Sequence, residues 1–313
     1  MNGGTGDTGS GPGGRRRQRL AAGSVAARGR RLRLLARQTV ASLQAGGQRS
    51  VFRGEGMEFD EVREYALGDD ARLIDWNVTS RMGSPFTKVF REQRELNLVL
   101  VVDVSRSLLG GDGARRELAA WIVAILAHAV HLAGDPVSAY LFSDRRERWL
   151  PARRGRDHPL RIAGEVQAIE PRGRGSDLAG ALRGVAGLLH RRATCVLVSD
   201  FKTTGFWPQL ALLRRRHEVV AVRVADAADV DFPAAGAVDL QDPETGRTTW
   251  ATGRSRRFRA AYGAYWEQHF REIRTGCRGH GVDLLEIATG DEPGAALASF
   301  FRHRSRRRRA AAC

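Results

Sequence analysis

Oxygen-bearing side chains recur at a regular spacing in the segment Asp103-Val104-Ser105-Arg106-Ser107. Alternate residues of an extended segment point the same way, so the Asp and the two Ser side chains can converge on one point. One carboxylate and two hydroxyls are hard oxygen ligands, which suit Mg²⁺, Mn²⁺ or Ca²⁺ rather than Zn²⁺. The spacing therefore indicates a divalent metal site, and Mg²⁺ is the ion that we expect there, with Mn²⁺ or Ca²⁺ as alternatives.

Two later segments offer further ligands of the same kind. Ser176 follows the loop Gly173-Arg174-Gly175, and Asp200 follows the apolar run 195–198. In parallel sheets, functional groups collect where strands end and helices begin. We therefore expect Ser176 and Asp200 to complete the protein's share of the ligands. Because so few of these ligands are charged, the ion would keep positive charge and an open position, which an acidic side chain of a partner protein can fill.

Helix capping is the alternative interpretation of Asp103, Ser105 and Ser107, since Asp and Ser both favour helix starts. The Asp-x-Ser-x-Ser spacing alone does not exclude capping. The matching groups at Ser176 and Asp200 favour the metal site. Asp177 stands at a predicted helix start, where its charge would instead favour the helix dipole.

Catalysis is a further alternative, because an Asp after an apolar strand also fits the aspartyl nucleophile of phosphotransferases. Those enzymes carry a second Asp two residues later, and Ser105 stands at that position here, so the general acid is missing. The sequence contains neither a GxSxG elbow nor an HExxH helix. We expect a binding site and not an enzyme.

The elements around these residues alternate between strands and helices. Residues 96–102 are a continuous apolar run typical of a strand buried on both faces, and the apolar period of 114–133 predicts a helix. Further strands are expected at 137–142, 195–198, 219–224 and 282–286, and further helices near 159–169, 178–189, 210–213 and 258–273. This alternation predicts an α/β fold with a doubly wound, mostly parallel sheet and helices on both faces. Residues 238–250 are expected to form a β-hairpin insertion.

The net charge of +16 is concentrated at the ends of the chain. Residues 1–50 contain ten Arg and one Asp, and residues 301–313 contain six Arg and no acid, which leaves +1 for residues 51–300. We expect a disordered Gly/Arg-rich tail over 1–30, a short helix and a strand-and-turn extension over 31–94, the main domain over 95–300, and a disordered Arg-rich tail over 301–313. The alternative is that the arginine-rich ends bind nucleic acids or anionic surfaces.

The cellular setting is inferred from what the sequence does not contain. Three scattered cysteines, Cys195, Cys277 and Cys313, argue against a disulfide framework or a zinc site. No signal peptide is visible, and the longest apolar run, 121–133, is shorter than the roughly 20 residues that a bilayer requires. We expect a cytoplasmic protein without a transmembrane segment.

The segment over residues 50–94 carries a long and specific motif. It runs from Ser50-Val-Phe-Arg-Gly54 through Gly68-Asp69-Asp70 and Ile74-Asp75-Trp76 to Lys88-Val-Phe-Arg-Glu92. This motif resembles the signature of the domain of unknown function 58 family, in which such a segment leads directly into a von Willebrand factor A-like domain. Within that segment we expect a turn at Gly68-Asp69-Asp70 and ion pairs between alternating arginines and acids. A brace at the sheet edge is the preferred role, and a docking surface is the alternative.

The resemblance also implies a function. The Asp-x-Ser-x-Ser segment is similar to the metal-ion-dependent adhesion site of von Willebrand factor A domains, where a Thr from a second loop and an Asp from a third complete the ligands. Here Ser176 stands at the Thr position, and the hydroxyl is kept. Proteins of the domain of unknown function 58 family are associated with MoxR-type AAA+ ATPases. The resemblance therefore implies a non-enzymatic adaptor that works with such an ATPase in assembling or activating another complex.

Overall fold

The computed structural model describes residues 55–66, 68–94, 97–109, 113–234, 236–241 and 248–312. The tail expected over 1–30 and the short helix expected after it lie outside the described residues. The elements, in chain order, are β1 (Glu55–Glu64), η1 (Ala71–Leu73), α2 (Trp76–Met82), β2 (Phe86–Arg94), β3 (Leu98–Asp103), α3 (Arg106–Leu109), α4 (Ala114–Leu132), β4 (Val137–Phe142), β5 (Arg146–Arg153), α5 (His158–Ala168), α6 (Leu178–Leu188), β6 (Thr194–Ser199), α7 (Trp207–Arg216), β7 (Glu218–Ala225), η2 (Ala227–Asp229), β8 (Ala237–Gln241), β9 (Thr248–Thr252), α8 (Arg256–Gly279), β10 (Asp283–Ala288) and α9 (Pro293–Ala312).

A six-stranded sheet forms the centre of the molecule, with the strand order β10-β7-β6-β3-β4-β5. The pairs from β10 to β4 are parallel, and β5 pairs with β4 in the antiparallel direction. Every residue of β3, β4 and β6 is buried, which explains why their sequences are continuous apolar runs rather than alternating ones. The fold class predicted from the sequence is confirmed. The edge strand β5 was not predicted, because half of its residues are charged and only Leu150 is buried.

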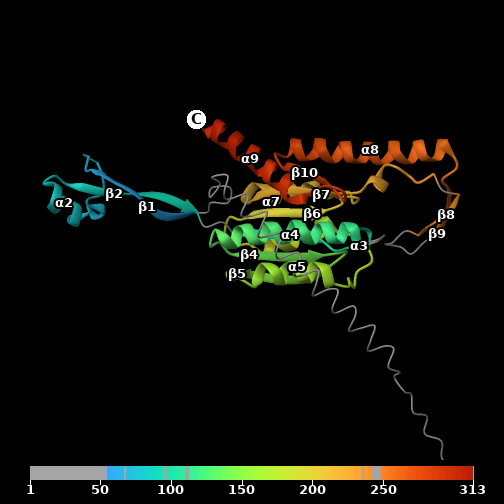
Figure 1. Cartoon of the computed structure of the whole chain (residues 1–313), viewed down its shortest axis with the longest axis horizontal. Helices are drawn as coiled ribbons and strands as arrows, with labels where there is room; N and C mark the ends of the chain where they lie inside the picture. The colour runs from blue at the N-terminus through green and yellow to red at the C-terminus, as the bar shows by residue number, and fades with distance from the viewer. Residues whose placement is uncertain are drawn as a thin grey trace, which may run out of the picture.

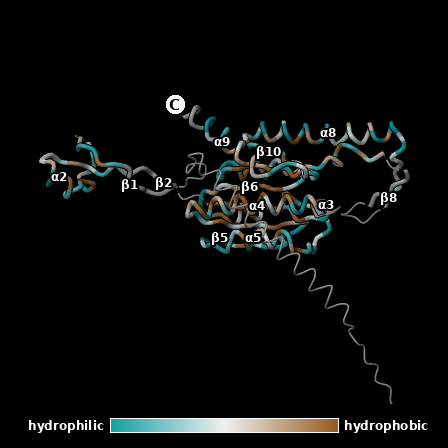
Figure 2. The backbone as a smooth tube through the Cα atoms, in the orientation of Figure 1, coloured by the Kyte–Doolittle hydropathy of each residue, from teal (hydrophilic) through white to brown (hydrophobic). Residues whose placement is uncertain are grey.

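Helices cover both faces of this sheet (Figure 1). Successive strand residues point to opposite faces, so β3 supplies Leu98, Leu100 and Val102 to one apolar core and Val99 and Val101 to the other. The first core is closed by α4, α5 and α9, and the second by α6, α7 and α8. Figure 2 shows the hydrophobic residues gathered in the strands and in α4 at the centre of the domain. This packing fixes the strand ends that carry the candidate ligands.

Two hairpins lie outside the central sheet. The hairpin β8–β9 confirms the predicted insertion. Strands β1 and β2 form an antiparallel arm, with η1 and α2 at its tip and the predicted turn beginning at Gly68, where φ is +110°. Figure 1 shows this arm extending away from the six-stranded sheet, so it does not brace the sheet edge as expected. Within the arm, the Arg63 guanidinium pairs with Asp69 at 2.7 Å, as the alternating charges predicted.

The C-terminal arginine run is helical and not the disordered tail that we expected over 301–313. Helix α9 extends to Ala312, because Leu297 and Phe301 pack on the apolar core and two of its arginines reach acidic strand starts. Arg304 pairs with Glu218 at 2.5 Å and with Asp283 at 2.6 Å, and Arg307 pairs with Asp283 at 2.7 Å. Neither α9 nor any other helix in the described part of the chain is long and apolar enough to cross a membrane.

Replacing Arg304 by Ala is expected to lower the free energy of unfolding by about 3 kcal/mol, because two partly buried carboxylates lose their shared guanidinium. Burial raises the pKa of Asp283, but hydrogen bonds and charges from Arg304 and Arg307 outweigh it and hold that pKa below its ordinary value. The stabilisation is therefore present above the ordinary Asp pKa and is lost as the pH falls. Urea denaturation measures it.

Arg307→Ala is the matched control, since Arg307 shares the Asp283 partner but its side chain is 68% exposed. We expect its loss to cost less than about 1 kcal/mol. Equal losses for the two variants would show that burial of the Arg304 pair does not stabilise the C-terminal helix.

Candidate metal centre

The candidate ligands lie at the carboxyl edge of the central sheet. Asp103 is the last residue of β3, and Asp200 directly follows the neighbouring strand β6. Ser176 lies in the loop before α6. Both carboxylates are buried, Asp103 with 0% and Asp200 with 2% of its surface exposed. The parallel register of β3 and β6 therefore places two acids side by side where water is excluded.

Hydrogen bonds join the predicted residues around Asp103. The Ser176 hydroxyl donates to Oδ2 of Asp103 at 2.8 Å, and the Ser105 backbone N–H donates to Oδ1 at 2.8 Å. The hydroxyls of Ser105 and Ser107 are 3.1 Å apart. The Ser105 contact is the local bond that a capping residue makes, but the contact from Ser176 comes from a different loop. Capping alone therefore does not account for the position of Asp103.

Burial and, to a lesser extent, the negative charge of Asp200 together raise the pKa of Asp103 to about 6. Hydrogen bonds from Ser105 and Ser176 act in the opposite direction without compensating fully. Two buried acids of like charge are costly unless a cation or a proton offsets them. The electrostatics of the site therefore favour a bound positive ion.

Asp200 offers an oxygen that the described residues leave unused. Its Oδ1 accepts the Lys202 backbone N–H at 3.2 Å, while its Oδ2 is buried without a hydrogen-bond partner in the described part of the chain. A buried carboxylate oxygen that lacks a partner is rare in folded proteins. A divalent ion fits this position, because carboxylate and hydroxyl oxygens are the ligands of Mg²⁺ and Ca²⁺.

The donor set differs from that of a zinc site. Among the described residues, no group of three or more His, Cys, Asp or Glu side chains is arranged to hold a metal. The candidate site has two carboxylates and its other oxygens come from serines, which suits a hard cation with an open position.

Ser199 is a member of the site that sequence reasoning did not include. Its hydroxyl donates to Oδ2 of Asp103 at 2.8 Å and accepts the Phe201 backbone N–H at 3.0 Å. Phe201 has φ of +55°, which is strained for a residue other than glycine. This turn is held by the His269 ring, whose Nε2 lies 2.7 Å from the Phe201 carbonyl oxygen. A Ser directly before Asp200 at a strand end was the available signal.

The loop that carries Ser176 is tied to the β4–β5 turn and to the start of β5. Backbone N–H groups of Gly173 and Arg174 donate to Glu147 at 2.8 Å and to Asp144 at 3.0 Å. Gly173 packs so closely that an added Cβ would lie 2.1 Å from the Ser143 hydroxyl. This close approach favours glycine at position 173.

Asp177 is the N-cap of α6, since its carboxylate accepts the Gly180 backbone N–H at 2.7 Å. This position agrees with the expectation that Asp177 serves the helix start rather than the metal site.

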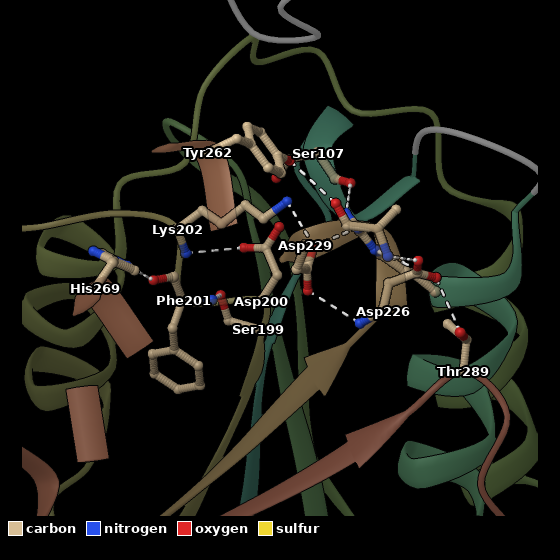
Figure 3. A network of polar contacts seen from close by, with 12 residues as sticks. Ser107, Ser199, Asp200, Phe201, Lys202, Asp226, Asp229, Tyr262, His269 and Thr289 are labelled. Atoms are coloured by element: carbon tan, nitrogen blue, oxygen red, sulfur yellow. Dashed lines mark hydrogen bonds and ion pairs between the residues drawn. The ribbon is translucent and has the colours of Figure 1, made fainter. Parts of the chain in front are cut away.

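A second polar network lies beside the candidate ligands (Figure 3). The buried carboxylate of Asp229, in η2, pairs with Arg115 at 2.5 Å and with Lys202 at 2.8 Å. Asp226 accepts the Thr289 hydroxyl at 3.0 Å. Arg115 also donates to the backbone carbonyl of Ser107 at 3.4 Å, which links this network to the Asp-x-Ser-x-Ser loop. Sequence reasoning missed the network, because its members are far apart along the chain.

Asp103→Asn tests the buried charge in protein from which metal has been removed by a chelator. Because the folded state prefers protonated Asp103, ionisation costs stability as the pH rises from the ordinary value of 3.8 to about 6. Asn cannot ionise, so the stability of the variant relative to wild type is expected to rise by about 3 kcal/mol across that interval and then to level off. Denaturation at a series of pH values measures the difference.

Asp177→Asn is the control, since Asn also serves as an N-cap. A relative stability of Asp103→Asn that does not change with pH would contradict the cost assigned to the buried pair.

Comparisons with known proteins place the chain in a family. Residues 61–272 match the family model described as protein of unknown function DUF58. The Mycobacterium tuberculosis protein Rv1480 and the Mycobacterium bovis protein Mb1516 are each 32% identical over 287 residues, which is 90% of this chain and 90% of theirs.

Solved structures similar to the chain share little sequence with it. The conserved hypothetical protein BatB from Bacteroides thetaiotaomicron is 12% identical, with a TM-score of 0.44, over 67% of this chain and 99% of that one. The SpRpn10 VWA domain is 9% identical, with a TM-score of 0.37, over 64% of this chain and 93% of that one. The match of the family model and the relatives at 32% identity agree. The chain belongs to the DUF58 family.

Proposed function

We propose that the chain is a non-enzymatic protein-binding module that binds an acidic partner through a divalent cation. Mg²⁺ is the cation that we propose. The observation that carries this proposal is the unused oxygen of Asp200, buried beside a second buried carboxylate on the neighbouring strand. Five side chains would hold the ion: Asp103, Ser105, Ser107, Ser176 and Asp200. When bound, the cation supplies a positive charge with an open position for a partner carboxylate.

The surrounding residues support this assignment by what they do to the ligands. The Ser199 hydroxyl orients the Asp103 carboxylate. The turn at Phe201, which directly follows Asp200, sets the backbone position of Asp200. Glu147 and Asp144 hold the backbone of the Ser176 loop. These contacts fix three loops in place before a partner arrives, so less conformational freedom is lost on binding.

The same geometry supports a binding role over a catalytic one. A phosphotransferase of the aspartyl type needs a general acid two residues after its nucleophile, and that position is Ser105, whose hydroxyl contacts Ser107. His269, near the site, is already bonded to the Phe201 carbonyl. Asp103 therefore serves better as a ligand than as a nucleophile.

A MoxR-type AAA+ ATPase is the partner that we propose, with a role in assembling or activating another complex. The support for this partner is the family to which the chain belongs, together with the association implied by that family. The acidic residue would lie on the ATPase or on the client that the two proteins share.

The competing function is association with nucleic acids or anionic surfaces through the arginine-rich ends. It requires arginines that are available to phosphates. In the C-terminal run, Arg304 and Arg307 instead pair with Glu218 and Asp283. We favour the metal-dependent function, because it rests on the buried carboxylates Asp103 and Asp200.

Isothermal titration with Mg²⁺ tests the metal site. Wild type and Asp177→Asn are expected to bind the ion, whereas Asp103→Ala is expected to lose at least about 90% of the affinity because a charged ligand is removed. Circular dichroism establishes that each variant is folded. Unchanged Mg²⁺ affinity in a folded Asp103→Ala protein would refute the proposed site.

Gel filtration with a purified MoxR-type ATPase from the same organism tests the partner. At a constant Mg²⁺ and nucleotide concentration, wild type is expected to co-elute with the ATPase and Asp103→Ala to elute alone. The ATPase also needs Mg²⁺ for its nucleotide. Because the Mg²⁺ concentration is the same for wild type and variant, any difference in co-elution comes from the candidate site. Co-elution of the ATPase with Asp103→Ala as well as with wild type would show that the complex does not use this site.

A further inference from the structure

Each loop that supplies a candidate ligand also carries a basic residue next to it. Arg106 stands between Ser105 and Ser107, and Arg174 comes two residues before Ser176. In the third loop, Lys202 comes two residues after the ligand Asp200. The contacts of Ser176 and Ser199 with Asp103 join the three loops, so these basic residues lie on neighbouring loops.

The acids near these loops are already engaged. Asp229 pairs with Arg115 and Lys202, and Asp144 pairs with Arg145 at 2.8 Å. The carboxylate of Asp177 serves as the N-cap of α6. We call the residues around the candidate ligands the rim of the site. The acidic side chains of this rim are therefore already paired with other residues of the chain.

The guanidinium groups of Arg106 and Arg174 have no such acidic partner within the described part of the chain. Both residues are exposed, and neither side chain forms an ion pair with a described residue. Lys202 differs, because its ammonium group is fixed between Asp229 and the ring of Trp266, which lies 5.1 Å away. Figure 3 shows the Lys202, Asp200 and Asp229 side chains turned toward the same region.

Two arginines without an acidic partner among the described residues make the rim of the site positive once the ion is bound. In the proposed function, a divalent ion offsets the two buried carboxylates, Asp103 and Asp200. The local charge at the rim is then positive, since Arg106 and Arg174 face solvent without compensation from the described residues. A partner with a single carboxylate would satisfy the ion alone and would leave both guanidinium groups unpaired.

We infer that this site selects a segment with several neighbouring carboxylates, one for the ion and others for Arg106 and Arg174. The inference rests on the proposed function and specifies the partner chemistry as an acidic peptide segment. Rim charges of this kind act mainly by steering a partner of opposite charge and speeding its association. Phosphate oxygens also bind Mg²⁺, so the experiment below includes a nucleic-acid probe.

Binding of labelled hexaglutamate, measured by fluorescence anisotropy on the full chain in saturating Mg²⁺, tests the inference. Arg106→Gln/Arg174→Gln is expected to raise the dissociation constant about tenfold, mostly through slower association and with a weaker salt dependence. A glutamine peptide of the same length with one Glu is expected to bind the double variant and wild type within about threefold of each other.

The matched control is Arg191→Gln/Arg192→Gln, which removes the same charge from exposed positions before β6, at the opposite edge of the sheet. It also retains the N-terminal arginines, so any non-specific attraction to the probe is equal in the two double variants. Equal loss of hexaglutamate affinity in both double variants, or no loss in Arg106→Gln/Arg174→Gln, would overturn the inference.

Two further arms separate this inference from the proposed function. If hexaglutamate binds equally well to Asp103→Ala and in chelator, the metal-dependent function fails, and an effect of Arg106 and Arg174 stands on its own. If Mg²⁺ binds but hexaglutamate does not bind wild type, the partner chemistry is wrong. An oligothymidylate of matched charge that depends on the two arginines more strongly than hexaglutamate does would assign the rim to nucleic acid and overturn the inference.

Discussion

Repulsion between two buried carboxylates sets the conditions for the carboxyl edge of this sheet. Asp103 and Asp200 end neighbouring strands, and both are withdrawn from water. Oxygens in that position need donors or a cation, and the chain supplies hydroxyl and N–H donors from three loops. The strained turn at Phe201 and the close packing of Gly173 follow from bringing those loops together. The order of the whole edge therefore depends on how this negative charge is neutralised.

Continuous apolar runs and helical periods were sufficient to predict the parallel sheet and most of its helices, because burial on both faces leaves a plain pattern. Asp103, Ser105, Ser107 and Ser176 could be grouped because strand ends converge, and the hydrogen bonds bring them together as expected. Strand β5 and the C-terminal part of α9 were missed because segments rich in charged residues carry little apolar signal, and the ion-pair partners of α9 lie far away in sequence.

Charge balance also explains what sequence spacing did not reveal beside the site. The pairing of Asp229 with Arg115 and Lys202 joins residues from η2, α4 and the loop after β6. No local pattern encodes such a set, since each member looks like an ordinary surface residue in its own segment. As a result, the acids at the rim are paired within the fold, while Arg106 and Arg174 face solvent.

The arginine pairs of α9 have a consequence for how the molecule can be handled. Glu218 and Asp283 are the first residues of β7 and β10, so Arg304 forms its ion pairs at the amino edge of the sheet. Strands of about six residues separate that edge from the candidate ligands by roughly 20 Å. A fusion partner or surface anchor attached after α9 would therefore emerge opposite the candidate ligands. Immobilisation through the C-terminus would leave the carboxyl edge, which carries the candidate ligands, accessible to molecules in solution.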